Sequence, residues 1–151
     1  MKHNNVTIRP FQPADQAATK KLILAGLAEH WGTLDPTLNP DLNDIVHSYQ
    51  NETFLLAVQD GEIIGCGALI TEKGMAGYGR IVRMSVKKEN RRQGLGQLIL
   101  HHLQLAAKQR HFQKIVLETT QTWLDVVAFY QTNGFKVIDH QDGDTHFEKA
   151  I

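Results

Sequence analysis

The sequence predicts one domain of the mixed α/β class over residues 1–151, and three observations carry this prediction. Strand-like and helix-like apolar patterns alternate along the chain. An Asp60-Gly61 pair between two apolar runs predicts a tight antiparallel hairpin in the first half. In the second half a strand, a glycine-rich turn, a helix and another strand follow one another, which is the order of a β-α-β crossover.

The chain is predicted to begin with a short strand followed by a helix. Val6 to Arg9 has a strand pattern, and after two prolines the run from Ala14 to Glu29 has helical character. The apolar residues of this helix include Ala17, Leu22, Ala25 and Leu27. Trp31 to Asn43 is rich in Gly, Pro, Asn and Asp and is predicted to be a long loop. A short helix is expected near Asp41 to Tyr49.

Three strands are predicted in the middle of the chain. Thr53 to Gln59 and Glu62 to Ile70 flank the hairpin turn and are predicted to pair with each other. Gly74 to Gly79 contains three glycines and is expected to be a flexible turn. Arg80 to Val86 is the next predicted strand.

The second half is predicted to alternate between helices and strands. The charged loop from Lys87 to Arg92 leads into a helix that begins at Leu95, with apolar residues at spacings of three and four. Those residues are Leu95, Leu98, Ile99, Leu103 and Ala106. Next come a strand, a helix and two strands, over Lys114 to Thr119, Trp123 to Thr132, Phe135 to His140 and Thr145 to Lys149. Asn133-Gly134 has the composition of a helix C-cap.

Composition excludes several functional classes. Lys plus Arg and Asp plus Glu both number 16, so the net charge is zero and no nucleic-acid partner is expected. No apolar run reaches the length that spans a bilayer, and we expect a cytoplasmic protein without a membrane partner. The single cysteine, Cys66, excludes an internal disulfide and is expected to be a small core residue. The eight histidines lack metal-ligand spacing, so no metal is expected.

The turn from Arg91 to Gly96 is the most informative segment of the sequence. It joins a strand pattern to a helix pattern and places Gly94 and Gly96 where the helix begins. A helix N-terminus offers unpaired N–H groups to an anion, and glycine lets the anion approach them. The P-loop pattern fails because no Lys-Ser or Lys-Thr follows, and the dinucleotide pattern fails because Ile99 stands where its third glycine belongs. The helix N-terminus and its glycines still predict that the turn binds a phosphorylated cofactor, and neither of these two patterns identifies which one.

Two motifs give the chain a resemblance to a known family. The R-x-x-G-x-G pattern of Arg91 to Gly96 resembles the coenzyme A pyrophosphate motif of the GNAT superfamily of acyl-CoA N-acyltransferases. Ala128 to Phe135 resembles that family's second signature, A-x-Y-x-x-x-G-F. Arg83 to Val86 and Leu117 to Thr119 resemble the strand ends that precede the two motifs. The resemblance implies the GNAT-type fold, of the α/β (α+β) class, with a central mixed, mostly antiparallel sheet and helices on both faces.

The resemblance implies a single N-acetyltransferase domain with acetyl-CoA as the acetyl donor. Backbone amides of the strand end and the turn are expected to bind coenzyme A, with the arginine side chains secondary. The implied cofactor-binding residues are Met84, Ser85, Val86, Arg91, Arg92, Gln93, Gly94, Leu95, Gly96 and Gln97. Trp123 stands where many relatives carry an asparagine, and core packing is expected there.

The resemblance also implies a mechanism. The strand that ends at Val86 splays from its neighbour, and the backbone amide of Met84 polarises the thioester carbonyl while an amine attacks it directly. Tyr130 then protonates the departing thiolate as a general acid. A phenol has a pKa of about 10 and a thiol of about 8.5, so this transfer is modestly uphill unless the site assists it. The alternative for Tyr130 is a packing role at the edge of the core.

The identity of the general base, the residue that removes the proton from the amine, stays open. Many relatives use a glutamate on the strand before the glycine turn, where this chain has Arg80 and Arg83. Glu118 is the first candidate for the general base, and Glu29 and His30 are the next. A water chain to bulk solvent is an equal alternative.

The favoured acceptor is a small-molecule amine, and in the family the region from Glu29 to Tyr49 selects it. A partly acidic, aromatic-lined cleft suited to a cationic amine is the hypothesis for this region. Its residues are Trp31, Asp35, Asp41, Asp44 and Tyr49. Two alternatives stay open: acetylation of a protein lysine or N-terminus, and a sensor that binds coenzyme A without chemistry. A homodimer is compatible with the sequence.

Overall fold

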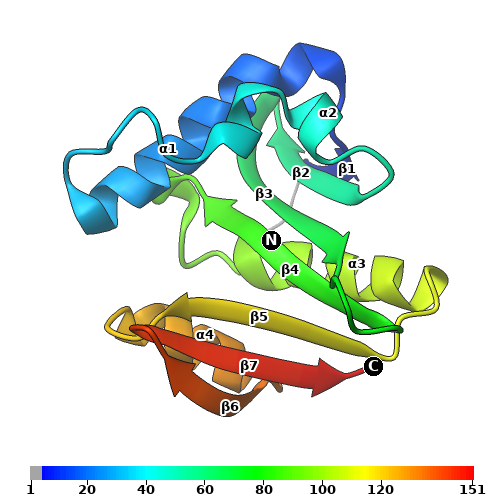
Figure 1. The fold of residues 1–151 in the computed structure, drawn as a ribbon. Helices are drawn as coiled ribbons and strands as arrows, with labels where there is room; N and C mark the ends of the chain where they lie inside the picture. The colour runs from blue at the N-terminus through cyan, green and yellow to red at the C-terminus, as the bar shows by residue number, and fades with distance from the viewer. Residues whose placement is uncertain (1–4) are drawn as a thin grey trace. The chain divides into compact units, whose positions relative to one another are not determined.

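The computed structural model describes residues 5–151, and the predicted elements are confirmed with small shifts at their ends (Figure 1). The strands are β1 (Val6–Pro10), β2 (Thr53–Gln59), β3 (Glu62–Thr71), β4 (Tyr78–Val86), β5 (Lys114–Thr120), β6 (Lys136–Gln141) and β7 (Asp144–Ala150). The helices are α1 (Gln16–Trp31), α2 (Ile45–Ser48), α3 (Leu95–Gln109) and α4 (Leu124–Thr132). Short 3₁₀ turns cover Pro13–Asp15, Pro40–Asn43 and Lys88–Asn90.

The described strands form one mixed sheet in the order β1-β2-β3-β4-β5-β7-β6. Strand β4 pairs with β5 in parallel, with Tyr78 opposite Lys114, and α3 connects the two strands as the predicted β-α-β crossover. The pairs β1–β2, β5–β7 and β6–β7 are antiparallel. The predicted mixed, mostly antiparallel sheet is therefore confirmed.

The chain divides into two compact units that share strands β3 and β4. The first unit runs to Ala68 and continues from Arg83 to Leu103. The second unit contains Leu69–Val82 and Gln104–Ile151. The glycine turn and the strand end before it belong to the first unit, whereas Tyr130 belongs to the second.

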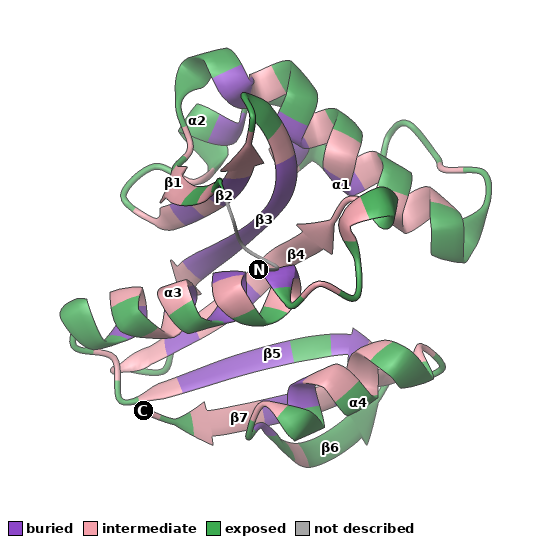
Figure 2. Ribbon diagram, turned by 180° about the vertical axis from the view of Figure 1, so that it is seen from behind, coloured by how far each residue is buried: buried purple, intermediate pink, exposed green. Residues whose placement is uncertain are grey.

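Two helices lie on opposite faces of the strands of the first unit. Glycines of β3 let α3 approach closely, because a Cβ on Gly67 would lie 2.9 Å from Cδ1 of Leu103. The side chain of Met84 reaches this same face, and its Sδ would lie 2.5 Å from that Cβ. Ser85 points the other way, since its Oγ would lie 3.0 Å from a Cβ on Gly26 of α1. Figure 2 shows α3 in front of β3 in the reverse view.

Buried residues make the core of the first unit, and Figure 2 colours the buried residues purple. The core residues from its strands and first helices include Ile23, Leu42, Ile45, Phe54, Leu56, Ile64 and Cys66. Those from α3 are Leu95, Ile99, Leu100 and Leu103. The apolar spacing predicts Leu95, Ile99 and Leu103 correctly, whereas the predicted Leu98 and Ala106 are half-buried and Leu100 was not predicted. These buried residues of α3 face the strands and so set the orientation of the helix.

Helix α4 of the second unit ends in a Schellman motif. The amide of Phe135 donates to the carbonyl of Tyr130 at 3.0 Å, and the amide of Gly134 donates to the carbonyl of Gln131 at 3.1 Å. Gly134 has a φ of +89°, as the motif requires. The rings of Tyr130 and Phe135 meet with their centroids 5.7 Å apart. The Y-x-x-x-G-F spacing is thus the spacing of a helix end with its hydrophobic contact.

Replacing Gly134 by alanine should lower the free energy of unfolding by about 1 kcal/mol, because alanine is strained at a positive φ. Urea denaturation followed by circular dichroism measures the change. Gly134→Asn is the matched control and should lose less, since asparagine tolerates the left-handed region better. A Gly134→Ala protein as stable as the parent would contradict this explanation of the motif.

Candidate active site

The predicted cofactor-binding residues form one continuous segment of the first unit. Met84, Ser85 and Val86 end β4, and a 3₁₀ turn at Lys88–Asn90 follows. Arg92 and Gly94 both have positive φ, at +61° and +80°, and α3 begins directly afterwards at Leu95. The chain therefore reverses sharply between the strand and the helix. The first N–H groups of α3 have no partners inside the helix, as at every helix N-terminus.

Arg91 connects this turn to the end of α1 by an ion pair with Glu29. Its Nη1 donates to Oε2 of Glu29 at 2.5 Å, and its Nη2 donates to Oε1 at 3.1 Å. Its Nε donates to the carbonyl of Val86 at 3.0 Å. The hydrogen bond from Arg91 lowers the pKa of Glu29, which makes Glu29 a weaker base. Contact between Arg91 and phosphate stays a prediction, as does that of the exposed Arg92.

Strand β4 contains a backbone irregularity immediately before Met84. Arg83 has a φ of +58°, in the left-handed region that few residues with side chains adopt. Its carbonyl accepts a hydrogen bond from Sγ of Cys66 at 3.2 Å. Burial raises the pKa of the Cys66 thiol to about 12, so the thiol keeps its proton as the donor. Cys66 is fully buried and is a core residue, as predicted.

The side chain of Arg83 joins the strand to the segment before β2. Its Nε and Nη2 donate to the two carboxylate oxygens of Asp41 at 3.0 and 2.7 Å, and Nη2 also donates to Oδ1 of Asn39 at 3.1 Å. The hydroxyl of Tyr49 donates to Oδ2 of Asp41 at 2.6 Å. Burial alone would raise the pKa of Asp41, but the hydrogen bonds from Arg83 and Tyr49 outweigh it and lower the pKa.

The other carboxylates proposed for an acidic cleft also have local partners. Asp35 accepts from the amide and hydroxyl of Thr37, and Asp44 accepts from the amide of His47 at the start of α2. Asp41 is neutralised by Arg83, whereas the exposed Asp35 and Asp44 keep their negative charge because their donors are neutral, and a site for a cationic amine stays a prediction. Trp31 is exposed at the end of α1.

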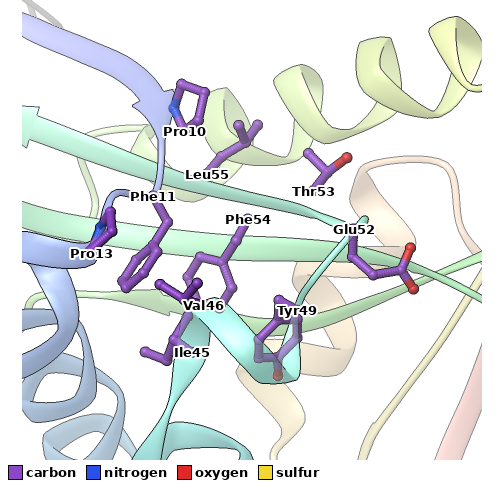
Figure 3. A pocket seen from close by; sticks show the side chains of 10 residues that line it. All are labelled: Pro10, Phe11, Pro13, Ile45, Val46, Tyr49, Glu52, Thr53, Phe54 and Leu55. Carbon is purple, nitrogen blue, oxygen red and sulfur yellow. The ribbon is translucent and has the colours of Figure 1, made fainter.

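The first unit contains an apolar cavity of about 390 Å³ beside α2, and of the proposed cleft residues only Tyr49 lines it (Figure 3). The ring of Phe54 lies 4.9 Å from that of Tyr49 and 5.6 Å from that of Phe11, between centroids. The lining residues are Pro10, Phe11, Pro13, Ile45, Val46, Tyr49, Glu52, Thr53, Phe54 and Leu55. Sequence reasoning did not predict this cavity, because its walls come from separate connections of the chain.

In the second unit, Tyr130 lies near the end of α4 in an aromatic cluster. Its ring centroid lies 5.1 Å from that of Phe129, and 5.7 Å from those of Phe135 and Phe147. The residue is only 6% exposed. Burial raises the pKa of its hydroxyl, so Tyr130 keeps its proton well into the alkaline range, and its surroundings make it a weaker acid toward a thiolate rather than a stronger one.

Glu118 lies in β5 of the same unit and belongs to a charge network. Nη1 of Arg80 donates to its Oε1 at 3.2 Å, and Nε2 of His146 lies 3.6 Å from its Oε2. Arg80 also forms an ion pair with Glu72. This network gives the carboxylate of Glu118 partners within the protein. A catalytic role for Glu118 stays a prediction. No group of three or more His, Cys, Asp or Glu within residues 5–151 is arranged to hold a metal.

Known structures share this architecture. An acetyltransferase of the GNAT family from Staphylococcus aureus Mu50 is similar, with a TM-score of 0.86, 22% identity, and 96% of this chain and 98% of that chain covered. The PaiA N-acetyltransferase from Thermoplasma acidophilum, in complex with coenzyme A, has a TM-score of 0.82 and 23% identity, covering 97% and 99% of the two chains. The fold is therefore the GNAT acetyltransferase fold.

Sequence comparison defines the family. Residues 50–137, more than half of the chain, match the model of the acetyltransferase (GNAT) domain. The IAA acetyltransferase of Azospirillum brasilense is 28% identical over 132 residues, which cover 87% of this chain and 84% of that protein. The chain belongs to the GNAT acetyltransferase family and is an N-acetyltransferase, and enzymes of this family use acetyl-CoA. Within residues 5–151, no helix is long and apolar enough to cross a membrane.

Cys66 should not react with the thiol reagent DTNB in the folded protein, because the side chain is fully buried and its pKa is raised. Absorbance should show one reactive thiol only after unfolding in urea. Rapid labelling of the native protein at neutral pH would contradict the buried donor role. An inert Cys66 also leaves DTNB free to detect the thiol of released coenzyme A.

Proposed function

We propose that the protein transfers the acetyl group of acetyl-CoA to the primary amine of a small molecule, by direct attack in a ternary complex. The observation that supports this most is the continuous segment from Met84 to Gln97, in which a strand end, a sharp turn and a helix N-terminus follow one another. This segment offers backbone donors to a long phosphorylated cofactor. Family membership supplies the identity of that cofactor.

Backbone amides from Arg92 to Gln97 bind the pyrophosphate in this proposal, and the end of β4 binds the pantetheine arm. Arg91 is secondary because Glu29 and the carbonyl of Val86 occupy its guanidinium. The glycines matter more than the arginines, since a side chain at Gly94 or Gly96 would stand where the anion approaches the amides.

The amine nitrogen attacks the thioester carbon, and the carbonyl oxygen becomes negatively charged in the tetrahedral intermediate. The amide of Met84 donates to that oxygen, and removal of a fixed donor of this kind in other enzymes costs roughly 10²–10³ in rate. The carbon–sulfur bond then breaks, and Tyr130 gives its proton to the coenzyme A sulfur. The proton of the amine passes to Glu118 or through water to solvent.

The acceptor is a small amine rather than a polycation in this proposal. A small acceptor is supported by the similarity to a protein named IAA acetyltransferase. A strongly cationic acceptor is disfavoured in this proposal, because Arg83 neutralises the half-buried Asp41, and Asp35 and Asp44 are exposed to water, where their attraction for a cation is weak.

The test of the function is thiol release from acetyl-CoA across a panel of small amines and of peptides with free lysines or N-termini. We expect release with small amines, polyamines being the poorest of them. Release with peptides alone would replace the small-molecule acceptor by a protein acceptor. Binding of coenzyme A in calorimetry without release for any acceptor would replace the enzyme by a sensor.

Tyr130→Phe should lower kcat by about 10²-fold or more while the Kd for coenzyme A stays nearly constant, because the change removes the proton donor and keeps the ring. The comparison uses steady-state thiol release and calorimetry. Phe129→Leu, which alters the same aromatic cluster without removing a proton donor, is the packing control. An unchanged kcat in Tyr130→Phe would contradict the role as general acid.

The pH dependence follows from the raised pKa of Tyr130. The acid form is active and burial favours it, so kcat should not fall as pH rises to about 10, the ordinary pKa of a phenol. At low pH kcat should fall, because the attacking amine is then protonated. A loss of kcat between about pH 8 and pH 9 in a protein that stays folded would contradict this assignment.

Gly94→Val and Gly96→Val should each weaken coenzyme A binding more than Arg92→Ala does. Valine at Gly94 is additionally strained, because the residue has a φ of +80°. Calorimetry gives the Kd, and the unfolding midpoint shows that each variant is folded. If Arg92→Ala raised the Kd for coenzyme A more than the glycine variants did, the pyrophosphate would be bound mainly by side chains, and the proposed role of the backbone amides would be contradicted.

A further inference from the structure

Arg83 occupies a strained backbone position inside β4. Its φ of +58° lies in the left-handed region, which glycine and asparagine adopt far more readily than arginine does. A strand residue holds such a conformation only when its surroundings fix it. The residue that follows is Met84, whose amide the proposed reaction uses.

The side chain of Arg83 is fixed by a forked ion pair. Asp41 accepts from Nε and Nη2 at 3.0 and 2.7 Å, Asn39 accepts from Nη2 at 3.1 Å, and the guanidinium side chain is 19% exposed. Two parallel hydrogen bonds to one carboxylate set the orientation of the guanidinium as well as its position. Tyr49 donates to Asp41 at 2.6 Å and thereby orients the carboxylate in turn.

The main chain beside Arg83 is fixed from β3. Sγ of Cys66 donates to the carbonyl of Arg83 at 3.2 Å, and the side chain of Met84 packs where Gly67 leaves room. The peptide group that joins Arg83 to Met84 carries both that carbonyl and the Met84 amide. Because a peptide group is planar, whatever orients the carbonyl orients the amide in the opposite direction.

We propose that Arg83 is a positioning residue for acetyl transfer: its ion pair with Asp41 holds the left-handed turn that aims the Met84 amide at the thioester oxygen. The inference rests on the proposed function and deepens it. It also gives Asp41 and Tyr49 a role other than attracting a cationic acceptor. The segment that contains them holds the strand end in its reactive geometry.

Asp41→Asn tests the ion pair, with Asp15→Asn as the matched control. Asp15 accepts a similar fork from Arg9 at 2.8 and 3.0 Å in the same unit. We expect kcat for thiol release to fall between about 10-fold and 100-fold in Asp41→Asn, with an unchanged Kd for coenzyme A, because a misplaced group loses rate more than binding. Asp15→Asn should lower the unfolding midpoint and leave kcat unchanged. Equal kcat in the two variants would overturn the proposal.

A glycine–alanine comparison at Arg83 separates a backbone role from a purely structural one. Glycine adopts a φ of +58° without strain, whereas alanine does not. If the side chain serves to hold the turn, Arg83→Gly should keep a higher kcat than Arg83→Ala although both lose the ion pair. A kcat in Arg83→Gly equal to or below that of Arg83→Ala would overturn the proposal.

Hydrogen exchange provides a readout that does not depend on the acceptor. Peptides covering residues 82–87 should exchange faster in Asp41→Asn than in the parent, and Asp15→Asn should not change them. If the parent protein releases no thiol with any acceptor, the proposed function fails and this exchange alone decides whether Asp41 holds the turn. Unchanged exchange in Asp41→Asn would then refute the positioning role.

Discussion

The close contact at Gly65 and Gly67 of β3 is the constraint on which the first unit depends. A Cβ on Gly65 would lie 2.8 Å from Cδ1 of Ile99, and a Cβ on Gly67 would lie 2.5 Å from Sδ of Met84. Because only hydrogen atoms fit at these positions, α3 packs directly against the strand and the Met84 side chain is held beside it. The end of β4 and the start of α3 are therefore fixed, and so are both ends of the turn between them.

Charged side chains around this segment bind one another. Arg91 is paired with Glu29 and Arg83 with Asp41. In these two pairs the positive charge of the arginine is balanced by a carboxylate, so these two arginines are less available to a ligand than the exposed Arg92 and the backbone amides are. In the proposed reaction, fixed dipoles would stabilise the charge that develops on the substrate, and such dipoles cost no reorganisation during the reaction. The strained residue Arg83 stands directly before Met84, whose amide the proposed reaction uses.

Local chemistry made the fold and both motifs predictable from the sequence. Asp60 and Gly61 both adopt positive φ in the hairpin turn, and Gly134 ends α4, as their residue types require. The ion pairs were not predictable, because Arg83 lies 42 positions from Asp41 and Arg91 lies 62 positions from Glu29. Such pairs leave no periodic signal. The face that α1 buries, with Thr19 and Ile23, was equally hidden, since its apolar residues form no clear stripe.

Amide exchange in the presence of coenzyme A tests most directly whether backbone donors of the first unit hold the cofactor. With uniformly ¹⁵N-labelled protein, coenzyme A should slow exchange at Met84 to Val86 and at Arg92 to Gln97, and should change amides outside these two segments far less. Coenzyme A that binds in calorimetry but protects neither segment would contradict this arrangement.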